Sequence, residues 1–319
     1  MLAFASAIEP LRAANRLADR QMFRWSLFAR DDAGACASNG IEIAVDHNTK
    51  VVPGLDLLLV CAGTADAAAN DVALCNWLRA VARRGAALGG ISLGPYALAR
   101  AGLLDGRRCA LHWENLSAFA EAFPRVRCTP DLFVIDGDRY TCAGGTAALD
   151  MMLQVIMRRH GRNLAHAVSE QFIHPRIRGT DDPQRMPIHA RLGIRNEKLA
   201  AAIAIMESTD EEPGTVQEIA RAIGLSSRQL ERLFAKHVEA SPSHYALRVR
   251  LDRARTLLLQ TTKSVLEVAV ICGFGSASHF SRCYRMAFGH KPSAARATLL
   301  AGTNARDGAA KGPRARELQ

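Results

Sequence analysis

Features that mark several large classes of protein are missing from this sequence of 319 residues. No apolar run approaches the roughly 20 residues that a membrane span requires, and no basic segment leads into an apolar block at the N-terminus, as it would in a secretory leader. The eight cysteines form no CxxC pair, and the ten histidines form no HExxH motif. We therefore expect a cytoplasmic protein with reduced, mostly buried thiols, no contact with a membrane, no bound metal and no cofactor.

The chain does contain an uneven distribution of charge. Its 49% hydrophobic and 23% charged residues are typical of globular domains, and its length suggests two of them. Residues 1–189 hold 21 Lys and Arg against 19 Asp and Glu, whereas residues 190–319 hold 20 against 12. A nearly neutral first part followed by a basic second part indicates an anionic partner for the second part.

The first part alternates between helix-like and strand-like segments. Apolar runs predict buried strands at 56–63 and 86–92, and residues 132–143 predict a hairpin that turns near Asp136 and Gly137. Helical patterns occupy residues 1–20, 70–85, 94–104 and 146–161. This alternation predicts an α/β domain, a flavodoxin-like, doubly wound parallel sheet. Such folds usually begin with a strand, so we expect that the first strand is missing or that Met1 is an internal start.

The second part contains an internal repeat, in residues 216–245 and 265–295. Positions in the first copy match positions in the second at an offset of 49 up to the glycine turn and of 50 beyond it, so the second copy has one more turn residue, placed at Gly275. Each copy reads as a short helix, a glycine turn and a second helix, with a small Ala (Ala220, Ala269) where the helices cross. The amphipathic helix 242–260 joins the two copies. The repeat predicts an all-α domain with two helix-turn-helix units.

In a helix-turn-helix unit the second helix presents its N-terminal residues to the major groove. Arg pairs with guanine and Gln with adenine, while Ser suits phosphates or either base. On a single helix such residues would be read as a solvated face, but two copies in one basic domain favour contact with DNA. The candidate DNA-binding residues are Ser226, Ser227, Arg228, Gln229 and Arg232 in the first copy, and Ser276, Ala277, Ser278, His279, Arg282 and Arg285 in the second.

The stretches "SSRQLERLF" and "CGFGSASHFSRCYRMAFGHKPSAAR" carry a resemblance. Residues 195–298 resemble the DNA-binding domain of AraC/XylS-type bacterial regulators. The resemblance implies that the two recognition helices occupy successive major grooves on one face of double-stranded promoter DNA. We also expect RNA polymerase as a partner and a homodimer as the working form.

Residues 1–170 resemble the PfpI and class I glutamine amidotransferase-like sensor domain of a GlxA-type subgroup of these regulators. The resemblance rests on residues 5–16, "GGISLGPYALARAGLLDGRR" (89–108), "HWENLSAFAEAFP" (112–124) and "CAGGTAALDMML" (142–153). Within the subgroup, these stretches most resemble regulators of glycine betaine and carnitine catabolism. A small-molecule effector, and specifically a quaternary ammonium compound, is therefore implied.

Residues Gly90 to Gly94 read G-x-S-x-G, the pattern of a nucleophile elbow, with Ser92 at its centre. Active relatives of the sensor fold place a cysteine at this position, often followed by a histidine, with a carboxylate from the loop after the first strand. Matched residue by residue, those positions are Ser92, Leu93 and Ser6, and Glu9 is out of register with the acid. The resemblance thus implies a degenerate elbow with no catalytic residue, and a protein that is not an enzyme.

A serine hydrolase or amidotransferase-like enzyme that uses Ser92 is the first alternative. The hydrolase order requires an acid and then a histidine downstream, and the sequence offers Asp136 or Asp138 followed by His160 or His166. Both histidines fall on or beside a predicted helix rather than on a loop after a strand. This placement argues against a triad.

The elbow lies at the carboxyl end of a strand, where α/β domains commonly bind ligands. For a quaternary ammonium effector the pocket should offer aromatic faces and a carboxylate. The predicted ligand-binding residues are Ser92, Leu93, Trp113, Glu114 and His112. The competing interpretation makes Trp113 a core or helix-start aromatic and Glu114 a first-turn charge that the helix dipole favours.

Together, these observations predict a transcriptional regulator, most simply an activator, that a metabolite controls. The expected domains are a ligand-sensing domain at 1–172, a linker at 173–194, a DNA-binding domain at 195–300 and a disordered basic tail at 301–319. Besides the enzyme, the second alternative is a DNA-binding protein whose sensor domain is vestigial and blind to ligands.

Overall fold

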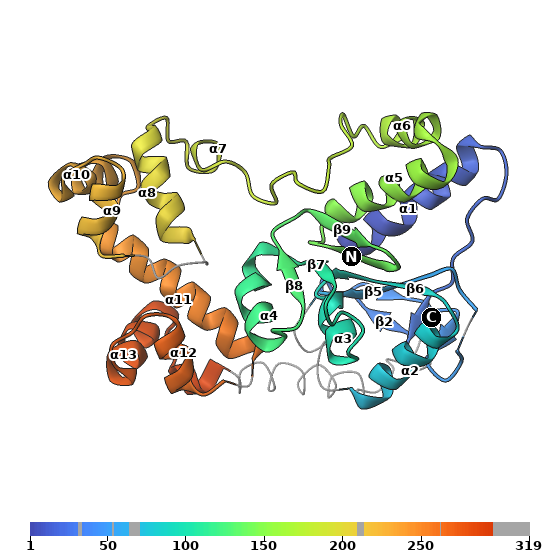
Figure 1. Ribbon diagram of the computed structural model, residues 1–319, viewed down its shortest axis with the longest axis horizontal. Coiled ribbons are helices and arrows are strands. Elements are labelled where there is room, and N and C mark those ends of the chain that lie inside the picture. Colours follow the sequence, from blue (N-terminus) through green and yellow to red (C-terminus); the bar gives the residue numbers. More distant parts are fainter. Residues whose placement is uncertain (31–33, 53, 64–70, 209–213, 262, 296–319) are drawn as a thin grey trace, which may run out of the picture. The chain divides into compact units, whose positions relative to one another are not determined.

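The computed structural model describes residues 1–30, 34–52, 54–63, 71–208, 214–261 and 263–295 (Figure 1). Contacts divide the chain into two compact units, Met1–Arg185 and Met186–Gln319. The predicted tail at 301–319 lies outside the described residues. No helix in the described part of the chain is long and apolar enough to cross a membrane.

A four-stranded sheet forms the centre of the first unit. Its strands are β5 (Leu57–Ala62), β6 (Ala87–Ser92), β9 (Phe133–Asp136) and β10 (Arg139–Cys142), and they lie in the order β5-β6-β10-β9. β5, β6 and β10 are parallel to one another, and β9 is antiparallel to β10. The predicted hairpin is therefore confirmed, and Gly137 turns it with a φ of +61°.

Helices cover both faces of this sheet, as the doubly wound prediction requires. On one face, α1 (Leu2–Leu17) and α5 (Ala147–His160) pack with Ile91 and Phe133, and α6 (Arg162–Gln171) packs against both helices. On the other face, α2 (Val72–Arg83) and α3 (Gly94–Arg100) pack with Leu88 (Figure 1). Successive strand residues point to opposite faces, so Leu88 and Ile91 belong to different hydrophobic cores.

Several short elements of the first unit have no counterpart in the sequence prediction. Strands of two or three residues are too short to show a periodicity, and each is set by its tertiary pairing. They are β1 (Phe28–Ala29) with β4 (His47–Asn48), β2 (Ala35–Cys36) with β3 (Glu42–Ile43), and β7 (Arg108–Ala110) with β8 (Arg127–Thr129). The 3₁₀ turn η2 (Trp113–Asn115) leads into α4 (Leu116–Ala122).

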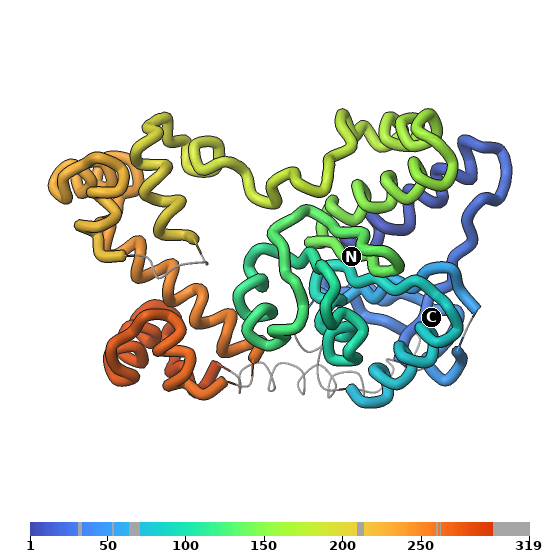
Figure 2. The backbone as a smooth tube through the Cα atoms, in the orientation of Figure 1, coloured from blue at the N-terminus to red at the C-terminus, as the bar shows by residue number. Residues whose placement is uncertain are grey.

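The second unit is helical throughout its described residues. α7 (Ile188–Leu192) and α8 (Glu197–Glu207) precede the repeat, and the two copies are α9 (Val216–Ala222) with α10 (Ser227–His237) and α12 (Val265–Ile271) with α13 (Ala277–Phe288). α11 (Pro242–Gln260) runs between them and contacts helices of both, and η3 (Pro292–Ala294) follows α13 (Figure 2). Both predicted turns have left-handed glycines, Gly224 at φ +67° and Gly273 at φ +70°.

Candidate functional site

Ser92 stands at a strained turn between β6 and α3. Its φ is +60°, a left-handed conformation that costs a residue with a Cβ on the order of 1–3 kcal/mol and that clusters at functional sites. Close packing explains the glycines around it, since a Cβ on Gly94 would lie 1.9 Å from the Val60 carbonyl oxygen, and one on Gly90 would lie 2.4 Å from the Pro95 nitrogen. The turn therefore has the backbone of a nucleophile elbow.

The chemistry expected of an active elbow is not assembled around Ser92. Leu93 is 6% exposed and packs in the hydrophobic core, and Ser6 lies on α1. Glu9, the nearby carboxylate, pairs with Arg12 at 2.7 Å. In the described part of the chain, no hydrogen bond joins the Ser92 hydroxyl to a histidine or a carboxylate.

The candidate triad partners have other contacts. Asp136 accepts a hydrogen bond from the Arg108 amide at 2.9 Å, and Asp138 pairs with Arg139 at 2.7 Å. The His160 ring packs edge-on against Phe23, with 5.0 Å between ring centroids, and His166 lies on α6. Asp136, Asp138 and His160 thus each have a contact other than Ser92, and His166 is exposed on α6.

The residues predicted around the effector fall into one cluster and one separate group. His112 caps η2, its ring lies 5.5 Å from the Trp113 ring, and its Nδ1 lies 3.7 Å from Glu114 Oε2. Trp113 is 36% exposed. No hydrogen bond, ion pair or ring contact among the described residues joins this cluster to Ser92 or Leu93. A single pocket containing all five residues therefore stays a prediction.

The segment 174–185 holds residues that the sequence analysis did not single out. It lies within the predicted linker but is bonded to the first unit: Gln184 Oε1 accepts from the Trp113 amide at 2.8 Å, and Gln184 Nε2 donates to the carbonyls of Leu111 at 2.9 Å and Asp131 at 2.8 Å. The Arg185 guanidinium lies 4.1 Å from the centroid of the Trp113 ring. Prolines and glycines suggested a linker, and no sequence pattern reveals such long-range contacts.

A buried carboxylate anchors the same segment at its other end. Asp150 on α5 is fully buried and accepts hydrogen bonds from Arg178 Nε at 2.9 Å, Arg178 Nη2 at 2.6 Å and the Arg178 amide at 2.8 Å. His174 Nε2 lies 2.8 Å from the same carboxylate. The signal in the sequence was an acidic residue within the apolar first half of a predicted helix, AALDMML.

In the second unit, the first predicted recognition helix begins with a reciprocal cap. The Gln229 amide donates to Ser226 Oγ at 3.3 Å, and Gln229 Oε1 accepts from the Ser226 amide at 2.9 Å. These two side chains satisfy the helix end, which is a structural role that the sequence analysis did not weigh. Arg228 and Arg232 are exposed, and Ser227 is half-buried.

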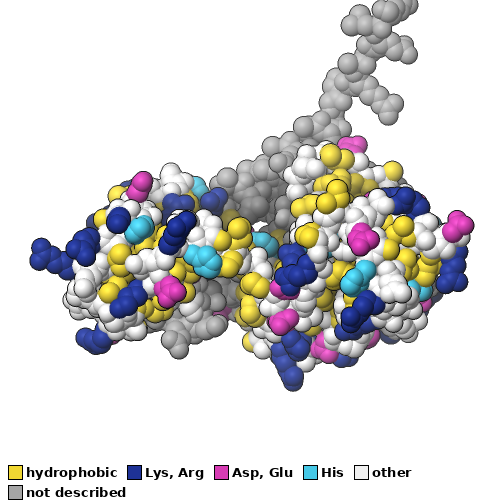
Figure 3. Space-filling model, turned by 90° about the horizontal axis from the view of Figure 1, so that it is seen from above, with side chains coloured by type: hydrophobic (Ala, Val, Ile, Leu, Met, Phe, Trp, Pro, Cys, Tyr) yellow, Lys and Arg dark blue, Asp and Glu magenta, His cyan; other side chains and the backbone are white. Residues whose placement is uncertain are grey.

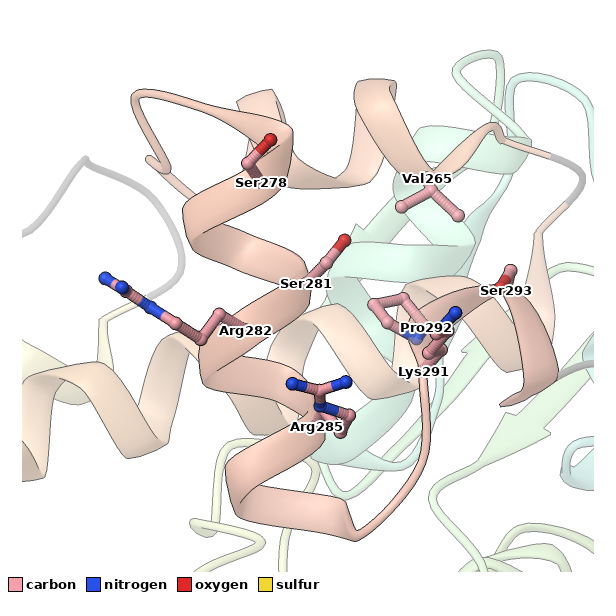
Figure 4. A pocket seen from close by; sticks show the side chains of 8 residues that line it. All are labelled: Val265, Ser278, Ser281, Arg282, Arg285, Lys291, Pro292 and Ser293. Carbon is pink, nitrogen blue, oxygen red and sulfur yellow. The ribbon is translucent and has the colours of Figure 1, made fainter.

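The second recognition helix, α13, borders an open cleft of about 300 Å³. Ser276 caps the helix by accepting from the His279 amide at 3.2 Å, and His279 Nε2 lies 3.3 Å from Cys283 Sγ. Arg285 and Lys291 lie close together at the cleft, and Arg282 also lines it but extends its guanidinium group away from them (Figure 4). Its remaining lining residues are Val265, Ser278, Ser281, Pro292 and Ser293. Ser281, Lys291 and Ser293 were not predicted, and the last two follow the end of α13.

Charged side chains are distributed differently over the two units. On the face shown in Figure 3, Lys and Arg predominate among the charged side chains of the second unit, whereas both signs are mixed over the first. This agrees with the charge asymmetry of the sequence. A basic helical unit with two capped, exposed second helices is suited to DNA phosphates and base edges.

Comparisons with known proteins bear on both units. A helix-turn-helix domain model matches residues 219–298, and the DJ-1/PfpI family model matches residues 7–158. The regulator GbdR of Pseudomonas aeruginosa is 48% identical over 92% of this chain and 80% of its own length. The chain belongs to the AraC family of HTH-type transcriptional regulators, in the group with a DJ-1/PfpI-like sensor domain.

Two further regulators are similar over nearly the whole chain. CdhR of Pseudomonas aeruginosa is 47% identical over 94% of this chain and 89% of its own length. GlxA of Rhizobium meliloti is 36% identical over 93% and 92%, respectively. As a member of this AraC family the protein is a DNA-binding transcriptional regulator, and both the predicted family and the predicted fold class are confirmed.

Proposed function

We propose that this AraC-family protein is a cytoplasmic activator of transcription that a quaternary ammonium metabolite controls. The DNA-binding part of this proposal is supported by the repeated pair of capped recognition helices in a basic unit. In this proposal residues 1–172 act as a non-enzymatic sensor, and residues 195–300 form the DNA-binding domain. A homodimer and contact with RNA polymerase complete the proposal.

The DNA contact divides into base reading and phosphate binding. Arg228 and Arg232 extend from α10 as exposed side chains, and together with Ser227 they face base edges. Ser226 and Gln229 already bond to each other, so in this proposal they position the helix and approach phosphates. In the second copy the cleft beside α13 receives a backbone phosphate between Arg285 and Lys291, and Arg282 extends away from the cleft. Ser276, Ala277, Ser278 and His279 lie at the groove end of the helix.

Two arginine substitutions test this assignment. Arg228→Ala and Arg282→Ala should each weaken binding to DNA selected by the wild-type protein from a random library, by about 1–3 kcal/mol where the arginine reads a base. An arginine that contacts only phosphate should instead reduce the salt slope of binding by about one unit for every sequence tested.

Fluorescence anisotropy at several salt concentrations measures both effects. Arg12→Ala is the matched control, since Arg12 lies on α1 of the first unit and pairs with Glu9. The assignment of the recognition helices is contradicted when both variants keep the wild-type affinity and salt slope while Arg12→Ala does the same.

The effector half of the proposal rests on the cluster of His112, Trp113 and Glu114. A quaternary ammonium ion binds favourably over an indole face, with a contribution of about 0.5–2 kcal/mol. Trp113 presents a partly exposed ring, and the next residue, Glu114, supplies a carboxylate. Calorimetric titration with glycine betaine and carnitine tests it, with Trp113→Leu as the variant expected to lose binding. The sequence resemblance to regulators of glycine betaine and carnitine catabolism selects these two compounds.

A further inference from the structure

The indole ring of Trp113 is already in contact with a cationic side chain of the same protein. The Arg185 guanidinium carbon lies 4.1 Å from the centre of the Trp113 ring. Guanidinium groups stack on aromatic faces because they are planar, charged and weakly hydrated. A trimethylammonium group would use the same attraction on the same ring, so one ring face cannot hold both cations at once.

Arg185 is kept at this place by its neighbour in the sequence. The Gln184 side chain accepts from the Trp113 amide at 2.8 Å and donates to the carbonyls of Leu111 and Asp131 at 2.9 and 2.8 Å. Gln184 thus ties the end of the 174–185 segment to the loop that carries Trp113 and, through Asp131, to the residues that follow β8. Further back, Arg178 is bonded to the buried Asp150, so the segment is held at both ends.

The position of Arg185 in the chain gives this contact a consequence. Arg185 is the last residue of the first unit, and Met186 is the first of the second. Arg185 therefore lies where the chain leaves the first unit and continues toward the DNA-binding domain. The contact lies wholly within the first unit.

We propose that Arg185 is an internal competitor of the effector for the face of Trp113, and that the effector acts by displacing it. The inference rests on the proposed function, since it assumes a cationic effector at Trp113. Displacement exchanges one cation on the Trp113 ring for another without covalent change. The states with Arg185 and with the effector on the ring therefore differ by a modest free energy, and a metabolite can shift the population between them. By linkage, effector binding and the state of the 184–185 connection influence each other equally.

The test compares effector affinity in the full-length wild type and in Arg185→Ala. Removing the competitor should tighten glycine betaine binding about two- to fivefold, the range that an exposed cation–aromatic contact supports. Arg185→Lys keeps the charge but loses the planar stack, so it should fall between the two. Arg12→Ala, an arginine removed elsewhere in the same unit, should match the wild type.

A ligand that lacks the cation separates competition from a structural effect. The carbon isostere of glycine betaine, 3,3-dimethylbutanoate, has the same shape and carboxylate but no cation, and its affinity should not follow that of glycine betaine through the Arg185 series. Tighter glycine betaine binding by Arg185→Ala with an unchanged isostere supports the inference. Equal or weaker binding by Arg185→Ala overturns the competition and leaves the proposed effector standing. Failure of the wild type and every variant to bind glycine betaine or carnitine overturns the proposed effector class, and the competition with it.

Discussion

At the scale of single residues, Asp150 shows how a buried charge organises a unit. Its side chain is fully buried and is matched by Arg178 and His174. Removing one partner of such a pair leaves an uncompensated charge, which typically costs about 3–5 kcal/mol.

Asp150→Ala should therefore lower the free energy of unfolding of the first unit by about 3–5 kcal/mol. Urea unfolding followed by circular dichroism measures it. Glu9→Ala is the control, because Glu9 pairs with Arg12 at the surface, where ion pairs contribute little. Equal stabilities for the two variants would show that the Asp150 pair does not hold the 174–185 segment.

The second prediction at this scale concerns Ser92. Because no base or acid lies beside its hydroxyl among the described residues, Ser92→Ala should keep effector-dependent DNA binding close to the wild-type level, and a covalent serine probe should not label the native protein. Mass spectrometry after exposure to a fluorophosphonate, with a reporter assay for the variant, provides both measurements. Specific labelling of Ser92, or loss of the response at unchanged effector affinity, would revive the enzyme alternative.

At the scale of elements, the helix-turn-helix units depend on their caps. In both copies the first helix begins with a reciprocal box: the Thr215 amide donates to Glu218 Oε2 at 2.7 Å, and the Ser264 amide donates to Glu267 Oε2 at 2.7 Å. Hydrogen bonds to the Thr215 backbone and side chain hold the pKa of Glu218 below its ordinary value of 4.5. The Ser264 hydroxyl and amide lower the pKa of Glu267 in the same way.

A depressed carboxylate pKa stabilises the fold at pH values above the unfolded-state pKa, and this stability is lost as the pH falls through the folded-state pKa. The urea midpoint of the second unit should thus fall on going from about pH 7 to about pH 4. Replacing both glutamates by Gln keeps an acceptor in the box but removes the titration, as Gln229 does naturally in α10. The double variant should show a shallower fall, and a slope identical to that of the wild type would contradict the role of the caps.

At the scale of the whole molecule, the proposal requires that ligand and DNA binding each stabilise the folded protein. A metabolite at about 100 times its dissociation constant adds about 2.7 kcal/mol to the free energy of unfolding. Glycine betaine or carnitine should therefore raise the melting temperature of the full-length chain, and Trp113→Leu should not respond. A thermal-shift screen measures this, and the absence of any shift with a broad set of metabolites would favour the ligand-blind alternative.

Regular elements were predictable because their patterns are local. The strands at 57–62 and 87–92, the 133–142 hairpin and both helix-turn-helix repeats follow from apolar period and turn glycines. The elbow was predictable as a turn, because its glycines are required where a Cβ would collide with neighbouring backbone. The two-residue strands were missed, since they exist only through pairing with distant segments.

The sequence by itself determined the family, through the resemblance of particular stretches to known regulators. It also determined the fold class and the basic character of the second unit, which follow from period, spacing and charge along the chain. Only the tertiary structure decided which side chains meet. It paired Asp150 with Arg178, placed Arg185 on Trp113, and brought Lys291 to the cleft of Arg282 and Arg285. Such contacts join residues from separate segments, and their partners are selected by packing and by the need to satisfy buried charge, which no local pattern encodes.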